Sequence, residues 1–348
     1  MDDQKESVFL ASVRAFFKTL LGTWGIVVAL GIVLVITGVV LKPSMNAPKT
    51  RLTIAPSTSG DISLLPSSSP VILKMNIHGI LGQGALTRES FEAILSESHS
   101  GVLAKDRVKA ILLDINTPGG SATTSDSLYR ALMEYKKKYN VPVYAFIDGM
   151  CASGGMYVAC AADKIFATHP SVIGSVGVIL GPAFNVYDLM QKIGVQALTL
   201  TEGKDKDMLN PFRPWKAGED ASLQHAIAAL YEQFVNIVTK SRPKISQSDL
   251  VNAYGAQVYI ADEAKELGYI DETVQSAFEV IDALATEANI PKEKVQVILS
   301  QSYHSLIAGW FDEKAPLRSG KHTHQIQLFP PLDPELSGQL LYLYPQGL

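Results

Sequence analysis

Two apolar runs, each followed by a glycine-rich turn and a helical pattern, constrain the fold most. Residues 108–115 read VKAILLDI and lead into NTPGGS, while residues 141–147 read VPVYAFI and lead into DGMCASGG. Strands that are apolar on both faces are typical of a parallel sheet covered by helices. We therefore expect an α/β fold with a mainly parallel sheet and βαβ crossovers.

The two glycine-rich turns are expected to meet, because ligands bind at the carboxyl ends of parallel strands. In the second turn, Ser153 stands directly before a Gly-Gly pair. Its hydroxyl has two interpretations: a nucleophile that a substrate must reach, or a cap on a tightly packed helix. A nucleophilic serine needs donors for an oxyanion. Gly154 at the helix start and Gly119 or Gly120 in the neighbouring turn are positioned to supply them.

Composition alone does not show which residue would act as the general base that accepts the proton of Ser153. His169 is the one histidine near Ser153 in the sequence, and a polar loop carries Lys204 and Lys206. A lysine accepts a proton at neutral pH only when its environment lowers its pKa by several units. Acidic residues on both sides of Lys206 would act in the opposite direction.

The two cysteines, Cys151 and Cys160, are nine positions apart. On one helix they would be separated by about 13 Å of rise, so we expect no disulfide between them. Cys151 is a rival nucleophile, but nothing in its local sequence would lower its pKa. His322 and His324 have no acidic or cysteine partner at metal-ligand spacing, and we expect neither a metal nor a cofactor.

Residues 20–41 contain no charged side chain. A helix of this length would extend roughly 33 Å, enough to cross a bilayer core of about 30 Å. No clean Ala-x-Ala site follows, so an uncleaved membrane anchor is favoured over a signal peptide. Basic residues flank the run equally and leave its orientation open. The net charge of −4, without long runs of one sign, gives no indication of a nucleic-acid surface.

Five motifs, taken in order, resemble one known family. They are INTPGGS, DGMCASGGMYVACAAD, IGSVGVI, EGKDKDMLNPFRPW and YIADEAKELGYID, between about residues 71 and 271. Together they are similar to the signal peptide peptidase A family of membrane-bound Ser–Lys peptidases, which includes SohB-like relatives and has a ClpP/crotonase-type fold. Any one motif is weak, and PGG with ASGG alone would also fit the wider ClpP and crotonase group.

The resemblance implies a role for each matching residue. It places the nucleophile at Ser153 and the general base at Lys206, with Lys204 as the competitor. It makes Ser175 the hydroxyl that orients the lysine, and Gly119 and Gly154 the oxyanion donors. The chain departs from the family at Ala256-Gln257, where Gly-Arg is common.

The resemblance also implies a setting and a substrate. The expected protein is a serine endopeptidase of the bacterial inner membrane, with a single span and its catalytic domain on the extracytoplasmic side. It would form a homo-oligomer in which Ser and Lys can come from adjacent subunits, and would cleave remnant signal peptides and other apolar or unfolded peptides. Two alternatives stay open: an inactive membrane-tethered scaffold that binds apolar peptides, and a ClpP-like Ser–His peptidase using His169.

The expected organisation has five parts. They are a cytoplasmic segment (1–19), a transmembrane anchor (20–41), a Ser/Pro-rich linker (42–70), a peptidase domain (71–285) and a C-terminal extension of uncertain role (286–348). Within the domain, the apolar pattern of residues 195–200 predicts a further strand.

Overall fold

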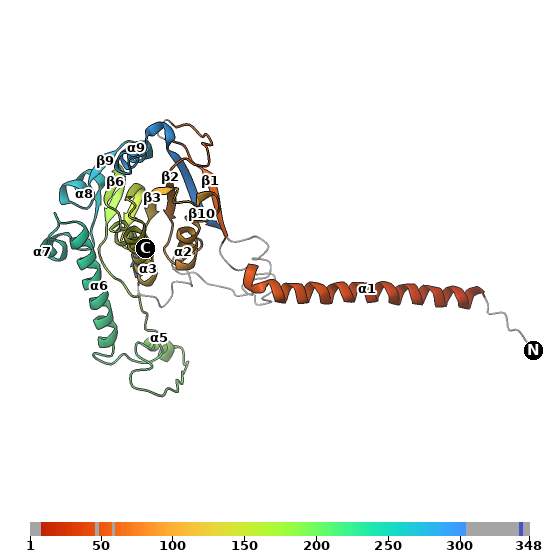
Figure 1. Ribbon diagram of the computed structural model, residues 1–348. Coiled ribbons are helices and arrows are strands. Elements are labelled where there is room, and N and C mark those ends of the chain that lie inside the picture. The colour runs from red at the N-terminus through yellow and green to blue at the C-terminus, as the bar shows by residue number, and fades with distance from the viewer. Residues whose placement is uncertain (1–7, 46–48, 58–59, 304–340, 344–348) are drawn as a thin grey trace, which may run out of the picture. The chain divides into compact units, whose positions relative to one another are not determined.

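The computed structural model describes residues 8–45, 49–57, 60–303 and 341–343 (Figure 1). They belong to two units: residues 1–48 with 304–321, and residues 49–303 with 322–348. In the first unit, α1 (Val8–Met45) is one continuous helix. Its segment Ser12–Gly31 is long and apolar enough to span a membrane by length and composition. The expected N-terminal apolar helix is therefore present, and this segment starts before residue 20.

The second unit is built on a nine-stranded sheet. Its main path runs β1 (Lys49–Ile54), β10 (Gln296–Tyr303), β2 (Val71–His78), β3 (Val108–Thr117), β5 (Val143–Ala152), β6 (Lys164–Thr168) and β9 (Glu272–Val274). The strands from β10 to β9 pair in parallel, and β1 is antiparallel at one edge. Strand β7 (Val172–Gly174) pairs in parallel with β5 and antiparallel with β8 (Val258–Ile260). The predicted α/β fold with a mainly parallel sheet is confirmed.

Helices cover both faces of the sheet. On β3, Ile111 and Leu113 pack in the cluster that includes side chains of α2 (Arg88–Glu97), α3 (Ala122–Tyr139), α4 (Gly154–Ala159), α6 (Ala221–Ser241) and α8 (Ala261–Leu267). Leu112 points to the other face, where α9 (Ala277–Glu287) packs. This alternation is the period of two that a strand imposes, and it explains why the run from Ala110 to Leu113 in β3 is apolar without interruption.

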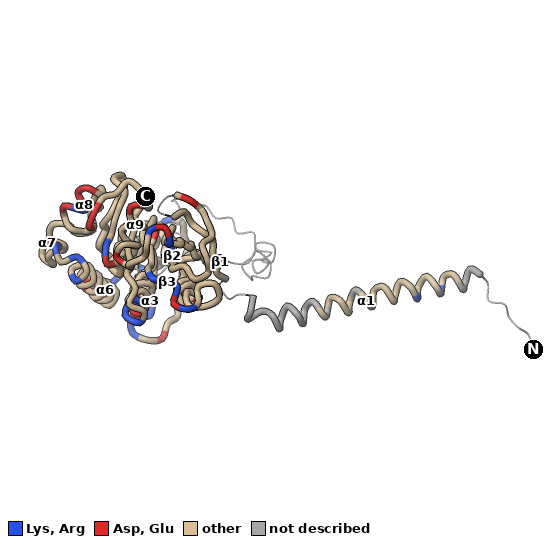
Figure 2. Tube along the Cα trace, turned by 45° about the horizontal axis from the view of Figure 1, so that its top comes forward, with Lys and Arg blue, Asp and Glu red and all other residues tan. Residues whose placement is uncertain are grey.

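Short elements complete the described chain. They are η1 (Gly101–Leu103), β4 (Gly119–Ser121), α5 (Tyr187–Lys192), α7 (Gln247–Asp249), η2 (Leu250–Tyr254), η3 (Lys292–Lys294) and β11 (Leu341–Leu343). Strands β4 and β11 form a separate two-stranded sheet. Basic and acidic residues are intermingled over the surface of this unit (Figure 2).

Three segments form structure that the sequence pattern did not indicate or lack a strand that it indicated. Residues 49–54, assigned to the linker, form β1, and residues 296–303, assigned to the C-terminal extension, form β10. These strands pair with each other, and β10 adds to β2, so a contact far apart in sequence creates both. Residues 195–200, expected as a strand, form none in the described structure, and that prediction was wrong. Leu198 and Leu200 are 84% and 85% exposed there.

A charged cluster lies on the sheet between β2 and β3. The Asp114 carboxylate is 2.6 Å from Lys74 Nζ and 3.1 Å from His78 Nε2, and Asp114 as a whole is buried. Burial alone would raise the pKa of Asp114, but the hydrogen bonds from His78 and Lys74 outweigh it and lower that pKa. The folded state therefore favours the ionised carboxylate.

We expect Asp114→Asn to reduce the free energy of unfolding near neutral pH by about 1–3 kcal/mol, because Lys74 loses its charged partner. A lowered folded pKa means that this stabilisation is present above about pH 4 and disappears as the pH falls through the folded value. Urea unfolding of wild type and variant at about pH 7 and pH 3 measures it. The difference in unfolding free energy between wild type and Asp114→Asn should be smaller at pH 3 than at pH 7. An equal difference at both pH values would contradict the stabilising role of the ionised Asp114.

Candidate active site

Ser153 lies at the junction between β5 and α4, just past the carboxyl end of a central strand. Its φ of 51° and ψ of −114° are unusual for a residue with a side chain. Its N–H donates to the Gly174 carbonyl at 2.8 Å, which holds this conformation. Strained backbone of this kind is common at functional sites. In hydrolases of the α/β class, a nucleophilic serine lies on a sharp turn between a strand and a helix.

The helix-cap interpretation of Ser153 has no support in the geometry. The residue occupies the N-cap position of α4, but its side chain makes no capping hydrogen bond. Gly155 allows α4 to pack closely against β3, since a Cβ at this position would lie 2.6 Å from Thr117 Cγ2. Ser153 is only 1% exposed, although a substrate must reach its hydroxyl if it is the nucleophile.

Ser175 occupies the corresponding position on the next strand. Strand β7 pairs with β5 so that Gly174 lies opposite Ala152, and each serine follows its paired residue. Ser175 is also buried, has a φ of 54°, and donates its N–H to the Gln257 carbonyl at 2.7 Å. The structure thus brings Ser153 and Ser175 to adjacent positions at one edge of the sheet.

The glycine turn after β3 forms β4 and lies close to Ser153. Thr117 of β3 is paired with Cys151 of β5. Thr117 comes two residues before Gly119 of the turn, and Cys151 comes two residues before Ser153. The Gly119 N–H donates to Thr117 Oγ1 at 3.0 Å. In this state the Gly119 donor is engaged within its own turn, and its role toward an oxyanion stays a prediction. Gly154 is the first residue of α4, where helix N–H groups have no partner within the helix.

The loop with the candidate lysine is apart from these residues. Lys204 and Lys206 are exposed, and the Lys206 N–H donates to the Gly203 carbonyl at 3.3 Å. This loop and α5 lie at the end of α6 that points away from the sheet (Figure 1). Among the described residues, no hydrogen bond joins Lys206 to Ser153 or Ser175. The pairing of Lys206 with Ser153 stays a prediction.

Arg213 fixes the loop beside Lys206. Its guanidinium contacts the Asp207 carboxylate at 2.7 Å, the Asp207 carbonyl at 2.8 Å and the Glu219 carboxylate at 2.6 Å. These hydrogen bonds lower the pKa of Asp207 and Glu219 and raise that of Arg213. One of the two acidic neighbours of Lys206 is therefore neutralised by Arg213. Sequence reasoning missed this residue, although it lies in the matching NPFRPW motif.

The alternative catalytic residues, His169 and Cys151, have no contact that would activate them toward Ser153 chemistry among the described residues. The exposed His169 places Nδ1 3.0 Å from the Asp262 carboxylate, and no contact joins it to Ser153 among the described residues. Cys151 and Cys160 are free and buried, and burial raises the pKa of both thiols, that of Cys160 to about 11.

Metal-binding groups are absent from the described part of the chain. No cluster of three His, Cys, Asp or Glu side chains able to hold a metal ion occurs there. His322 and His324 lie outside the described residues.

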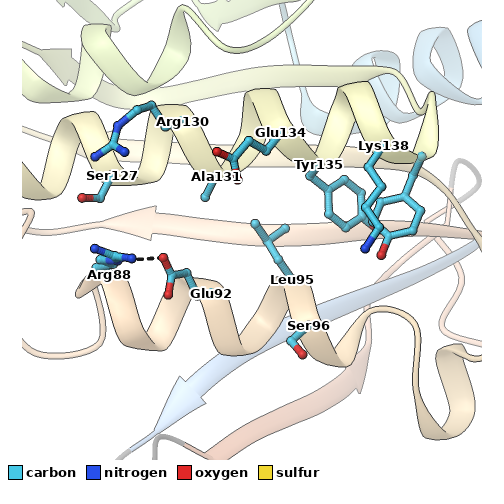
Figure 3. Close-up of a pocket in the computed structure, with 11 residues that line it drawn as sticks. Arg88, Glu92, Leu95, Ser96, Ser127, Arg130, Ala131, Glu134, Tyr135 and Lys138 are labelled. Carbon is cyan, nitrogen blue, oxygen red and sulfur yellow. Dashed lines mark hydrogen bonds and ion pairs between the residues drawn. The ribbon is translucent and has the colours of Figure 1, made fainter.

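A groove of about 420 Å³ lies between α2 and α3, away from these turns (Figure 3). The helices present charged side chains along it, including the Arg88–Glu92 pair on α2 and Arg130 and Glu134 on α3. Its charges are of both signs and largely compensate one another. The groove contains none of the residues predicted to act in catalysis.

The family model for peptidase family S49 matches residues 135–291, which include Ser153, Ser175 and the lysine loop. This part of the chain is a peptidase family S49 domain. The S49 match covers strands β5 to β9, the turn with Ser153 and the loop of Arg213. The glycine turn with Gly119 precedes the matched residues.

Named relatives agree with the S49 assignment. A protein of Methanocaldococcus jannaschii named as a protease is 36% identical over 53% of this chain and 58% of its own length. A protein of Enterococcus faecium named signal peptide peptidase SppA is 29% identical over 64% and 65%. Protease 4 of Haemophilus influenzae is 29% identical over 58% and 32%. The chain therefore spans less than two thirds of the length of these relatives.

Among solved structures, a ClpP1 mutant from Listeria monocytogenes matches 61% of this chain and 94% of its own, with 17% identity and a TM-score of 0.40.

Replacing Arg213 with Gln should loosen the loop around Lys206, because Asp207 and Glu219 lose their shared donor. Hydrogen exchange of backbone amides in residues 201–215 should become faster by about tenfold. Lys192→Gln on α5 removes a nearby charge without touching this cluster and serves as the control. Unchanged exchange in Arg213→Gln would show that other contacts hold the loop.

Proposed function

We propose that this protein is a membrane-anchored serine endopeptidase with a Ser–Lys dyad. The observation that supports it most is Ser153: a buried serine in strained backbone, not used as a helix cap, at the carboxyl edge of a parallel sheet. The S49 domain and the relatives named as proteases support the same reaction class.

In the proposed reaction, Ser153 Oγ attacks the peptide carbonyl and neutral Lys206 takes its proton. Ser175 holds the lysine amine, and the proton passes to the leaving amine. Gly154 and Gly119 N–H groups stabilise the oxyanion, for which Gly119 must release its bond to Thr117. Water then hydrolyses the acyl-enzyme. Lys206 rather than Lys204 is proposed as the base because it matches the family position.

We place Ser153 and Lys206 of one active site on different subunits of a homo-oligomer. In the single chain Lys206 is exposed and makes no contact with Ser153. Apolar side chains on the same segment are also exposed, among them Ile193 (65%), Leu198 (84%) and Leu200 (85%). A neighbouring subunit that covers these side chains would remove apolar surface from water and bring a lysine to the serine edge.

The apolar N-terminal helix and the SppA-named relative indicate membrane association. We extend this to a single-pass protein of the bacterial inner membrane with its S49 domain on the extracytoplasmic side. Remnant signal peptides and other apolar or unfolded peptides are the proposed substrates. This topology would place the active site where cleaved signal peptides are released.

The competing function is an inactive scaffold that binds apolar peptides. It draws on two observations: Ser153 is buried, and Lys206 is exposed, with no hydrogen bond to Ser153 among the described residues. A Ser–His mechanism has less support, since His169 is engaged by Asp262 at the surface.

The dyad is tested with the full chain in detergent and a fluorescent apolar peptide. Ser153→Ala and Lys206→Ala should each lower kcat/KM by at least about a thousandfold, because each removes a group needed in the transition state. Lys204→Ala is the matched control and should retain turnover. A serine-reactive phosphonate should label wild type and not Ser153→Ala. Full activity in Lys206→Ala would exclude this base, and an unlabelled, inactive wild type would favour the scaffold.

Subunit sharing is tested by mixing two inactive chains. Co-expressed Ser153→Ala and Lys206→Ala chains should regain about a quarter of wild-type activity, because about half of the serines and half of the facing lysines are intact. If serine and lysine come from the same chain, every mixed site carries one defect and no activity returns. The oligomeric state of each preparation is checked by light scattering.

A further inference from the structure

Three helices begin where the candidate catalytic segments end. Helix α3 directly follows the glycine turn, α4 directly follows Ser153, and α6 follows the loop that carries Lys206. The Tyr157 ring of α4 packs against the Phe234 ring of α6, with 5.1 Å between the ring centroids. The Tyr129 ring of α3 contacts the same tyrosine edge-on at 5.6 Å. Tyr157 is therefore a residue at which all three helices meet.

A hydrogen-bonded junction joins these helices at the Tyr157 hydroxyl. This hydroxyl donates to Asp126 Oδ1 of α3 at 2.9 Å and accepts from Gln233 Nε2 of α6 at 2.7 Å. Gln233 Nε2 also donates to Asp126 Oδ1 at 2.9 Å, and Arg130 Nε donates to Asp126 Oδ2 at 2.7 Å. A carboxylate only accepts hydrogen bonds, so the amide nitrogen is the atom of Gln233 that must face it. Every contact of the junction thus joins a donor to an acceptor.

Tyr157 connects this junction to the nucleophile turn within one turn of helix. Its N–H donates to the Ser153 carbonyl at 3.1 Å, and α4 is only six residues long. Tyr157 is also fully buried. A short helix with a strained residue before it and a buried, hydrogen-bonded hydroxyl on it has little freedom to rotate, because hydrogen bonds weaken when their angles change. The nucleophile side of the junction is therefore fixed by the core.

The other side of the junction supports α6 where this helix leaves the core. Its buried residues are Phe234, Val235 and Val238, and every residue before them is exposed or half-buried. Gln233 directly precedes this buried part, and Ala221 begins the helix 12 positions earlier. At about 1.5 Å per residue, the start of α6 is roughly 18 Å from Gln233, so a tilt of about 5° would move it by roughly 1.6 Å. Burial is non-directional, whereas hydrogen bonds depend on angle, so the contacts of Gln233 determine this direction.

From this arrangement we propose that Tyr157 is a positioning residue for hydrolysis. Through Gln233, its hydroxyl fixes the direction in which α6 carries the lysine loop away from the nucleophile helix. A misplacement of about 1 Å can lower a rate by about a hundredfold, so a loop at the far end of α6 is sensitive to small tilts at the junction. This role rests on the proposed function, because it takes Lys206 as the base. It applies whether Lys206 serves its own chain or a neighbouring one, since both require a defined direction of α6.

The direction of α6 is measured without catalysis, so that the junction is tested separately from the dyad. In the full chain, spin labels on Glu202→Cys in the lysine loop and Lys137→Cys on α3 report their separation by pulsed electron paramagnetic resonance. Both positions are exposed, the two native cysteines are buried, and labelled chains are diluted into unlabelled ones. Tyr157→Phe keeps the ring that packs on Phe234, and its distance distribution should become wider. Tyr231→Phe is the matched control on α6 and should leave the distribution unchanged. Equal distributions in Tyr157→Phe and the parent would overturn the proposal.

Kinetics of the unlabelled chains test the consequence for the reaction. Tyr157→Phe should lower kcat for the fluorescent apolar peptide by about tenfold and leave KM within about twofold, because the base is displaced while the peptide contacts are unchanged. Gln233→Met, at an exposed position, removes the amide from the same contact and should give the same result. Tyr231→Phe should match wild type. A loss through KM alone, or full activity beside a wider distance distribution, would show that the junction does not position the base. An inactive wild type would instead overturn the proposed function, and the distance distributions would still show whether Tyr157 directs α6.

Discussion

Parallel pairing of β3, β5 and β7 is the constraint on which the rest of the candidate site depends. Thr117 lies opposite Cys151, and Ala152 lies opposite Gly174, so three consecutive strands end at one edge of the sheet. The chain must change direction after each of them. The glycine turn, Ser153 and Ser175 occupy those changes of direction, and their proximity follows from strand register alone.

This register also explains why strained backbone persists there. A non-glycine residue at positive φ costs roughly 1–3 kcal/mol, and it is retained only where surrounding structure determines it. The N–H of Ser153 donates to Gly174 of β7 at 2.8 Å, and that of Ser175 donates to Gln257, directly before β8, at 2.7 Å. The helix that follows Ser153 is fully buried from Gly154 to Ala159. The core therefore stabilises a geometry that the two serines would not adopt in an isolated peptide.

The sequence predicted those features that arise from local pattern and strand order. The apolar strands and the meeting of the turns after β3 and β5 belong to this class. A place for Ser175 beside the site came from the resemblance to a known family and not from the pattern. The sequence did not predict contacts formed by chain ends, such as β1 with β10 or β11 with β4, because short polar or isolated strands carry little periodic signal. The expected strand at 195–200 failed for a related reason: its apolar residues were taken as evidence of pairing, and no strand pairs with them in the described structure.

Two surfaces of the second unit differ in whether other residues of the same chain cover them. The edge of β4 is an unpaired row of backbone groups unless a strand covers it, and β11 supplies one from the same chain. The exposed apolar side chains near Lys206 receive no such cover from their own chain. Under the proposed sharing of active sites between subunits, a neighbouring chain would cover these side chains and bring the base to Ser153. An isolated chain would then lack the base, which would limit proteolysis before the oligomer has formed.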